Sequence, residues 1–228
     1  MIYISLSSKS LKVALWLSIF IVCSVQNLNA QCQALPVTNL VTNGSFSAAN
    51  TGFISGYRNC TDPNCLYPEG RYSIGRTADY FHDNFVGRDH TTGSGNFMII
   101  NGAGAPNTIV WSQKITVKPG VNYNFSSWVS SLNVRSPAKL QFQINGQTIG
   151  DIFSAPANLR NWQEFFVTWN SGTADTARIT ILNQNNDLGG NDFGLDDISF
   201  KEICPTKQPL LGPDISICGM GTLDLSSN

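Results

Sequence analysis

Between Leu40 and Phe200, apolar and polar side chains alternate with a period of two residues rather than 3.6. The clearest example is Lys139–Asn145, where Leu, Phe and Ile alternate with Gln, Gln and Asn, and Asn145-Gly146 follows as a hairpin turn. Successive side chains of a strand point to opposite faces, so this segment is predicted to be a half-buried strand.

Similar segments, each bounded by turn residues, recur along the chain. They are Phe97–Ile100, Ile109–Val117, Tyr123–Ser130, Glu164–Trp169, Arg178–Leu182 and Phe193–Phe200. Seven or eight antiparallel strands without a helical segment predict an all-β fold, an antiparallel β-sandwich of the jelly-roll type.

The alternation breaks within the last of these segments. Phe193 and Leu195 share one parity, whereas Ile198 and Phe200 share the other. One extra residue would return both pairs to the same face, so we expect a β-bulge at Asp196-Asp197 that directs one carboxylate inward.

The N-terminus has the features of an export signal. Lys9 and Lys12 precede the apolar run Val13–Val25, and the small-residue site ends at Ala30. The run is shorter than the ~20 residues that span a bilayer, which argues against a membrane anchor. Residues 1–30 are therefore predicted to be a signal peptide cleaved before Gln31, leaving a mature chain with no transmembrane segment that is secreted or on the cell surface.

Charge excludes one class of partner. Charged residues make up 13% of the chain, and the formal net charge of -1 becomes -3 once the two lysines of the signal are removed. Average soluble domains contain about 25% charged residues. No basic patch with interleaved aromatic residues is present, so nucleic-acid binding is excluded.

Export places the cysteines in an oxidising compartment, where disulfides persist. Cys60 and Cys65 bracket a turn-rich Thr-Asp-Pro-Asn stretch and are predicted to form a local disulfide. Cys32 and Cys204 frame the body of the chain, and a second disulfide between them would join the first strand to the last. Cys218 is then left over, which indicates a partner outside this sequence or a free thiol. Zinc binding at Cys60 and Cys65 is the weaker alternative, because no second pair at ligand spacing follows.

Four short motifs carry a resemblance to known families: Asn43–Phe46, Asp89–Gly93, Tyr123–Trp128 and Leu195–Phe200. They resemble the galactose-binding-like jelly rolls of carbohydrate-binding modules, and the Asp-His-Thr-Thr-Gly run also resembles MAM domains. Residues 32–204 are similar to the N-terminal module of large Bacteroidetes surface proteins that continue into Ig-like or PKD-like repeats. The resemblance indicates the fold more than a ligand, because this fold has binding, structural and accessory roles alike.

Domain boundaries follow from the composition and from this resemblance. Residues 31–204 are predicted to form one jelly-roll domain. Residues 205–228 begin with a proline-containing linker and continue as Leu210–Cys218, which resembles the start of an Ig-like or PKD-like repeat. About twenty residues cannot bury a core of their own, so this segment is expected to be the start of a truncated β domain.

The acidic segment Asp187–Asp197 concentrates hard oxygen ligands and flexible glycines, the chemistry that Ca²⁺ requires. Its spacing is not that of an EF-hand. The resemblance implies a structural calcium held by Asp197 and Asp196 near Asn43, although Ser47 stands where the related modules often carry glutamate. The alternative is a solvated acidic turn.

A tryptophan on the polar side of a strand suggests a ligand. Trp128 shares parity with Ser126 and Ser130, whereas Tyr123 and Phe125 point the other way. Sugars stack on aromatic rings while amides bind their hydroxyls, so Trp128 with Gln141 and Gln143 would form a glycan platform if the three lie on one face. The alternative places Trp128 beneath a loop in a small secondary core.

Catalysis is not expected. Asp89 and His90 alone do not supply a nucleophile, a base and its orienting group. The glutamates Glu69, Glu164 and Glu202 do not form the compact carboxylate motif of jelly-roll glycosidases. Two functions remain: a noncatalytic glycan-binding module, or a structural or adhesive module that contacts other cell-surface proteins.

Overall fold

A computed structural model describes residues 37–203. The predicted signal peptide, the predicted pair Cys32 and Cys204, Cys218 and the predicted repeat at 205–228 lie outside the described residues. Within residues 37–203, no helix is long and apolar enough to cross a membrane.

The described chain consists of strands joined by turns and loops, and all seven strands expected from the sequence are present to within two residues at either end. The strands are β1 (Arg58–Asn59), β2 (Arg71–Gly75), β3 (Phe97–Asn101), β4 (Thr108–Thr116), β5 (Asn122–Ser131), β6 (Lys139–Ile144), β7 (Gln147–Ser154), β8 (Gln163–Asn170), β9 (Thr176–Asn183) and β10 (Phe193–Glu202).

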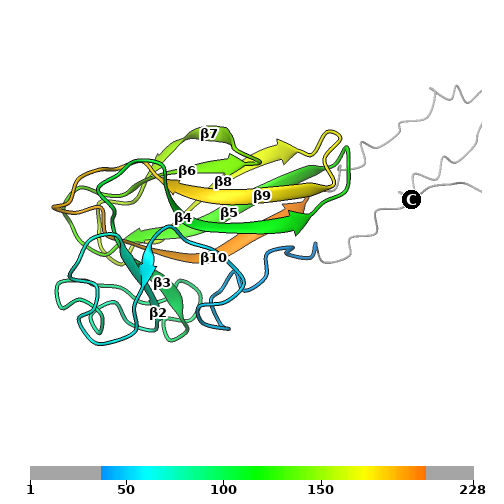
Figure 1. The fold of residues 1–228 in the computed structure, drawn as a ribbon. Coiled ribbons are helices and arrows are strands. Elements are labelled where there is room, and N and C mark those ends of the chain that lie inside the picture. Colours follow the sequence, from blue (N-terminus) through cyan, green and yellow to red (C-terminus); the bar gives the residue numbers. More distant parts are fainter. Residues whose placement is uncertain (1–36, 204–228) are drawn as a thin grey trace, which may run out of the picture. The chain divides into compact units, whose positions relative to one another are not determined.

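The strands form two sheets that pack face to face (Figure 1). One sheet has the order β1-β2-β3-β10-β5-β8 and the other the order β4-β9-β6-β7. Every pairing is antiparallel except the short contact between β1 and β2, which is parallel. The all-β sandwich expected from the sequence is therefore confirmed.

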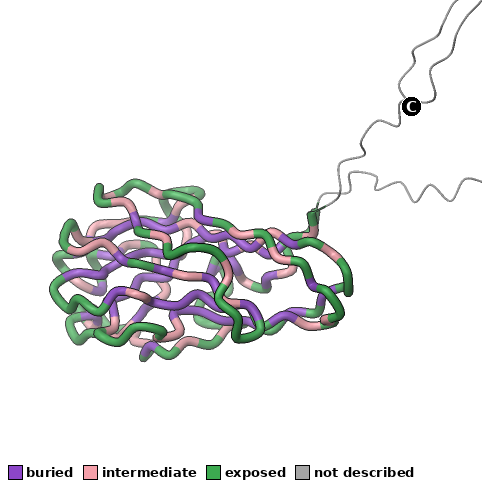
Figure 2. Tube along the Cα trace, turned by 90° about the horizontal axis from the view of Figure 1, so that it is seen from above, coloured by how far each residue is buried: buried purple, intermediate pink, exposed green. Residues whose placement is uncertain are grey.

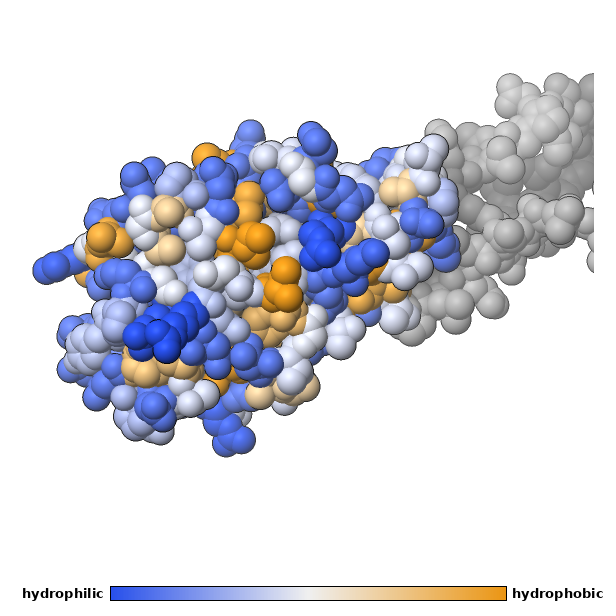
Figure 3. Space-filling model, viewed as in Figure 1, coloured by the Kyte–Doolittle hydropathy of each residue, from blue (hydrophilic) through white to orange (hydrophobic). Residues whose placement is uncertain are grey.

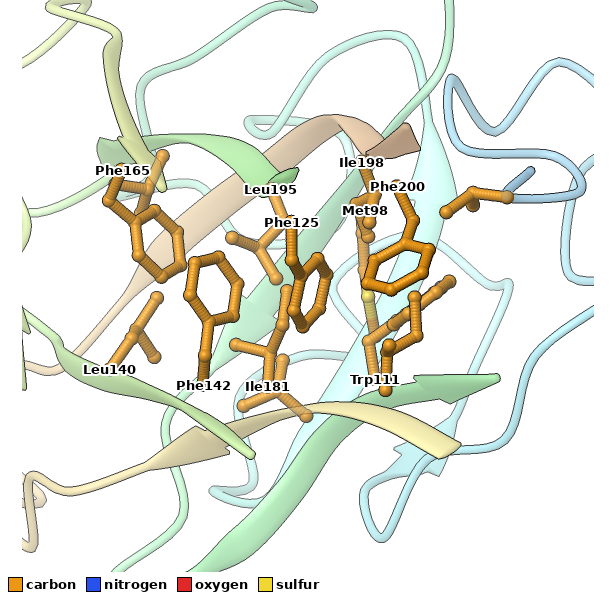
Figure 4. Packing of buried hydrophobic residues seen from close by; sticks show 14 of the residues in the cluster. Met98, Trp111, Phe125, Leu140, Phe142, Phe165, Ile181, Leu195, Ile198 and Phe200 are labelled. Carbon is orange, nitrogen blue, oxygen red and sulfur yellow. The ribbon is translucent and has the colours of Figure 1, made fainter. Parts of the chain in front are cut away.

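Aromatic side chains fill the space between the sheets. The rings of Phe125 and Phe142 lie 4.0 Å apart, and Phe142 stacks on Phe165 at 4.3 Å, so one row of rings joins β5, β6 and β8 (Figure 4). Buried residues gather along the strands, and exposed residues lie mainly in the loops that join them (Figure 2). Each fully buried apolar side chain contributes roughly 1.5–3 kcal/mol, so this row is one part of a larger core that holds the layers together.

The β-bulge expected in the last strand is present. Asp196 pairs with Trp128 and Ser199 pairs with Ser126, so β10 carries one more residue than β5 between these two pairs. Asp197, inside the bulge, has φ of 46°. The extra residue returns Ile198 to the same core as Leu195 on the other side of the bulge.

Past the bulge, β10 no longer pairs with β3. The segment around Leu40 and Gly44, near the start of the described residues, is hydrogen-bonded to β10 there instead. Leu40 N–H donates to Phe200 O at 2.9 Å, and Ile198 N–H donates to Gly44 O at 2.9 Å. A Cβ at position 44 would lie 2.1 Å from the Ile198 carbonyl oxygen, so the Asn-Gly-Ser-Phe motif needs glycine where it passes β10.

A second, smaller core lies on the outer face of the six-stranded sheet. Loop side chains between positions 60 and 90 pack there against β3, and the cluster comprises Leu66, Ala78, Phe81, Phe85, Phe97, Ile99 and Leu132. The predicted Cys60–Cys65 disulfide is present and packs against this cluster. The loops therefore cover one part of this face and leave the part around Trp128 outside the cluster.

Adjacent phenylalanines on β8 test this arrangement. Phe165 is 6% exposed and stacks on Phe142, whereas Phe166 is 64% exposed. We expect Phe165→Ala to lower the free energy of unfolding by about 3–5 kcal/mol because it leaves a cavity in the core. Phe166→Ala should change it by less than about 1 kcal/mol. Urea denaturation measures both, and equal losses would contradict the assigned faces of β8.

Candidate ligand-binding site

Trp128 lies on the outer face of the six-stranded sheet, on β5, which is next to the edge strand β8. It pairs with Glu164 on β8 and with Asp196 on β10. Directly paired residues project to the same face of a sheet, so two carboxylate side chains flank the indole there. The predicted position of Trp128 on the polar face of its strand is thus observed.

A cleft of about 460 Å³ opens beside Trp128. One wall is formed by residues between 39 and 47, in the segment that runs beside β10. The floor is formed by outward-facing residues of β5, β8 and β10. The lining residues are Asn39, Val41, Asn43, Gly44, Ser45, Ser47, Ser126, Trp128, Glu164, Asp197, Ile198, Ser199 and Lys201. One indole surrounded by hydroxyl, carboxylate, amide and ammonium groups suits a polyhydroxylated ligand.

His90 fixes the orientation of the indole. Its imidazole stacks on Trp128 with the ring centroids 3.9 Å apart and the planes 17° from parallel. His90 Nδ1 donates to Asp197 Oδ2 at 2.8 Å, and the Thr91 hydroxyl donates to the same oxygen at 2.5 Å. Asp197 therefore holds His90 against Trp128, and the bulge in β10 determines where the indole lies.

The loop that carries His90 is organised by Asp89. The Asp89 carboxylate accepts hydrogen bonds from the Thr92 and Gly95 N–H groups at 2.9 and 2.8 Å and from the Thr92 hydroxyl at 2.9 Å. Asp89 thus closes the loop that leads into β3.

Asp196 does not point into the core as expected from the bulge: it shares the outer face with Trp128, where the His90 loop covers it. It is 2% exposed, and its two oxygens accept hydrogen bonds from the backbone N–H groups of His90 and Asp197 at 2.9 and 2.8 Å. Burial raises the pKa of Asp196 to about 7 against the opposing effect of the His90 N–H, and the Asp197 charge adds to the rise. Asp196 therefore connects the His90 loop to β10 without being accessible to a ligand.

Gln141 and Gln143 do not join Trp128. Both lie on β6 in the other sheet, where Leu140 and Phe142 point into the core. The two glutamines consequently face away from the interior on the opposite side of the sandwich, and Gln141 Nε2 donates to Gly150 O at 3.1 Å. Alternation predicts correctly that Trp128 and the two glutamines point away from the core of the sandwich. The three do not share one face, because they lie in different sheets and the pairing of strands is not visible in the sequence.

Asn43, Asp196 and Asp197 do not fit a calcium ion in this arrangement. Asn43 Oδ1 accepts the Ala48 N–H at 2.9 Å, and its Nδ2 donates to the carbonyls of Ala49 and Thr51 at 2.9 and 2.8 Å. The side chain thus closes its own loop, while both oxygens of Asp196 and one oxygen of Asp197 already accept protein donors. Among the described residues, no group of three or more His, Cys, Asp or Glu side chains is placed to hold a metal ion.

Glu164 and His90 are site residues that sequence reasoning did not assign to the ligand. Glu164 alternates with the buried Phe165, so its outward direction is visible in the sequence. Its position opposite Trp128 depends on the register of β5 and β8, which the sequence does not reveal. The stacking of His90 likewise depends on a contact with β10 more than one hundred residues away in the chain.

A second cleft, of about 440 Å³, adjoins the same loop and is lined by Trp162 together with Arg88, Arg160, Asp79 and Asp83 among other residues. The Trp162 ring lies 5.8 Å from His90, edge to face. His90 therefore contacts an indole from each of the two clefts.

No family model and no curated protein matches this chain. Solved structures match over most of its length. The CBM22-1 xylan-binding domain of Xyn10C from Paenibacillus barcinonensis is 13% identical with a TM-score of 0.50, and the match covers 75% of this chain and 97% of that one. The fold is an all-β jelly roll like that of this domain.

The same fold also occurs in an enzyme. The Stig cyclase Fisc from Fischerella sp. TAU is 13% identical with a TM-score of 0.52, and the match covers 73% of this chain and 98% of that chain. Function therefore has to be argued from the residues of this chain.

The buried Asp196 predicts how stability depends on pH. An unfolded aspartate has a pKa of about 3.9, so between about pH 4 and 7 the native state retains a proton that the unfolded state has released. The stability contributed by Asp196 is complete below this window and is lost as the pH rises through about 7. Asp196→Asn cannot titrate, so its free energy of unfolding should fall less over this window than that of the unmodified protein.

Urea denaturation from about pH 4 to pH 8 measures this difference, with Asp151→Asn, an exposed carboxylate on β7, as the control. The control should follow the unmodified protein. Identical pH profiles for all three proteins would contradict the assignment of Asp196 as a buried titrating group.

Proposed function

We propose that the domain is a noncatalytic glycan-binding module that binds its ligand in the cleft beside Trp128. The observation that carries the proposal is the placement of Trp128 opposite Glu164 in a cleft that Asp197 also lines. An indole stacks on the C–H face of a pyranose ring, and carboxylate and hydroxyl groups around it accept and donate hydrogen bonds to the sugar hydroxyls.

The fixed orientation of the Trp128 indole supports binding. Trp128 is stacked on His90, which is hydrogen-bonded to Asp197, so the indole does not lose rotational freedom when a ligand arrives. The jelly roll that resembles this domain in the Paenibacillus protein is described as xylan-binding. A soluble polysaccharide such as xylan is therefore a suitable first probe.

The carboxylates of the cleft argue against hydrolysis. Glycosidases use one carboxyl with a raised pKa as an accessible general acid and a second carboxylate across the scissile bond. The raised pKa beside this cleft belongs to Asp196, which is 2% exposed and bonded through both oxygens. Asp197 is engaged with His90 and Thr91.

Export of the module is part of the same proposal. The predicted signal peptide and the Cys60–Cys65 disulfide support a secreted or cell-surface location, because disulfides persist in oxidising compartments. The resemblance to N-terminal modules of Bacteroidetes surface proteins supports a position at the start of a longer, repeat-containing protein.

An adhesive role is the second candidate, and an apolar surface favours it. Phe166 on β8 is 64% exposed and Ile152 on β7 is 51% exposed, and both line a shallow depression of about 430 Å³ between the edges of the two sheets. On the face shown in Figure 3, hydrophobic side chains form separate patches among hydrophilic ones. A partner protein would bury such a patch, whereas a glycan would not require it.

Removal of the indole tests glycan binding. Trp128→Ala should weaken binding to the polysaccharide at least tenfold, about 1.4 kcal/mol, because the stacking surface is lost. Affinity electrophoresis with xylan and other soluble polysaccharides, together with a glycan array, identifies the ligand and measures the loss. Near-UV circular dichroism verifies that the variant is folded.

Two matched substitutions separate this cleft from other surfaces. Gln143 lies on the opposite sheet, and Phe166 lies in the apolar depression. The variants Gln143→Ala and Phe166→Ala should therefore bind the polysaccharide as tightly as the unmodified protein. Binding that survives Trp128→Ala but is lost in Gln143→Ala would contradict the proposed site. A folded protein that binds no glycan would favour the adhesive role.

Activity on the bound polysaccharide gives an independent test. Incubation with the ligand should release no reducing ends, because beside this cleft Asp196 is buried and Asp197 is hydrogen-bonded to His90 and Thr91. A reducing-sugar assay with Glu164→Gln as the comparison measures this. Release that disappears in Glu164→Gln would show instead that the cleft is catalytic.

A further inference from the structure

The second cleft, of about 440 Å³, is lined by two arginines whose charges are not paired within the described chain. Arg88 lies in the loop before β3, and Arg160 lies in the turn that leads into β8. The ion pairs and hydrogen bonds of residues 37–203 include neither guanidinium group. Two cations in one cleft attract an anion, and each guanidinium can donate two parallel hydrogen bonds to a carboxylate.

Three carboxylates line the same cleft, but they do not neutralise the arginines. No described carboxylate lies within 4.0 Å of either guanidinium group. Asp89 is hydrogen-bonded within its own loop, and Asp83 is the partner of the Tyr67 hydroxyl. Asp79 is the third carboxylate, and it is placed to accept a hydroxyl group of a ligand.

Trp162 supplies an aromatic wall for this cleft. A Cβ at Gly194 would lie 3.1 Å from Trp162 Cη2, so the indole lies over β10 on the outer face of the six-stranded sheet. Its edge contacts are with Phe97 at 5.9 Å and His90 at 5.8 Å between ring centroids. These contacts fix the indole, so it loses little freedom when a sugar ring stacks on it.

The two clefts lie on the same face of the sheet. Gly194 lies two positions before Asp196 on β10, and Asp196 pairs with Trp128. Residues two apart on a strand point to the same face and are about 7 Å apart. Trp162 and Trp128 are therefore neighbours on the outer face, and the His90 imidazole contacts both of them. Consecutive sugars of one chain can reach both indoles.

We propose that the second cleft binds an acidic sugar residue, with Trp162 stacked on the ring and with Arg88 and Arg160 bound to its carboxylate or sulfate group. The proposal rests on the function proposed above, because a neighbouring residue of the same glycan would occupy the Trp128 cleft. An acidic polysaccharide would fill both clefts, whereas a neutral one such as xylan would leave the two arginines unpaired. The acidic chain should therefore bind more tightly.

The overall charge of the protein does not explain such a preference. The predicted mature chain has a net charge of -3, so the protein as a whole repels a polyanion. Tighter binding of an acidic polysaccharide would consequently require a local group of cations. This makes the charge of the ligand a specific test of the second cleft.

Matched pairs of polymers measure what the acidic group contributes. Isothermal titration compares polygalacturonate with its carboxyl-reduced form, and carrageenan with its desulfated form. One acidic polymer should bind about tenfold more tightly than its neutral partner, because hydrogen bonds to charged groups are stronger than neutral ones. The pair that shows this difference distinguishes a carboxylate from a sulfate ligand. The difference should become smaller at high salt, because the arginines are exposed.

Single substitutions locate the acidic group. Arg88→Gln and Arg160→Gln should each weaken binding of the acidic polymer about tenfold and leave binding of its neutral partner unchanged. Arg178→Gln is the control, because it removes the same charge from β9 in the opposite sheet, and it should bind both polymers like the unmodified protein. Trp128→Ala should weaken binding of both. Near-UV circular dichroism verifies that each variant is folded.

The outcomes separate this proposal from the one on which it rests. Equal binding of acidic and neutral polymers would overturn the acidic subsite, and loss of that binding in Trp128→Ala would still support the Trp128 cleft. A preference for acid that is lost in Lys201→Gln but kept in both arginine variants would also overturn it, because Lys201 lines the Trp128 cleft. A preference that needs both arginines but survives Trp128→Ala would support the second cleft and contradict the first. Failure of the folded protein to bind any of the four polymers would overturn both.

Discussion

Both oxygens of the Asp196 carboxylate accept backbone N–H groups: the bond from Asp197 lies within the bulge of β10, and the bond from His90 holds this bulge against the His90 loop. The bulge returns Ile198 to the core and turns Asp197 outward toward His90. His90 in turn stacks on Trp128. One extra residue in one strand thus links the packing of the core to the surface on which a ligand is proposed to bind.

The sequence predicts those features that depend on neighbours along the chain. Alternating side chains locate the strands, the change of parity after Leu195 locates the bulge, and the spacing of Cys60 and Cys65 predicts their disulfide. Strand β7 was not identified because it is an edge strand with mostly exposed residues, and alternation is weak where neither face is fully buried. Strand β2 lies between two long loops and is buried only at Tyr72 and Ser73, so it gives no alternation either.

The composition of the site is less predictable, because it depends on which strands are neighbours. Trp128 and Gln143 both lie on the outward face of their own strand, yet β5 and β6 belong to different sheets. Glu164 reaches Trp128 through the register of β5 with β8, and the loop of His90 is joined to β10 over a long separation in the chain. The face of a strand on which a side chain lies can be predicted from the local sequence. Which side chains of different strands lie next to one another can be learned only from the folded chain.

The proposal that glycans bind beside Trp128 is tested most directly by following individual groups during a titration. In an assigned ¹H–¹⁵N spectrum, addition of the polysaccharide fragment that binds best should shift the Trp128 indole N–H and the backbone amides of Ser126 and Ser199. The side-chain amides of Gln141 and Gln143 should remain unchanged. Shifts confined to the glutamines, or to the surroundings of Phe166, would contradict the proposed location of the site.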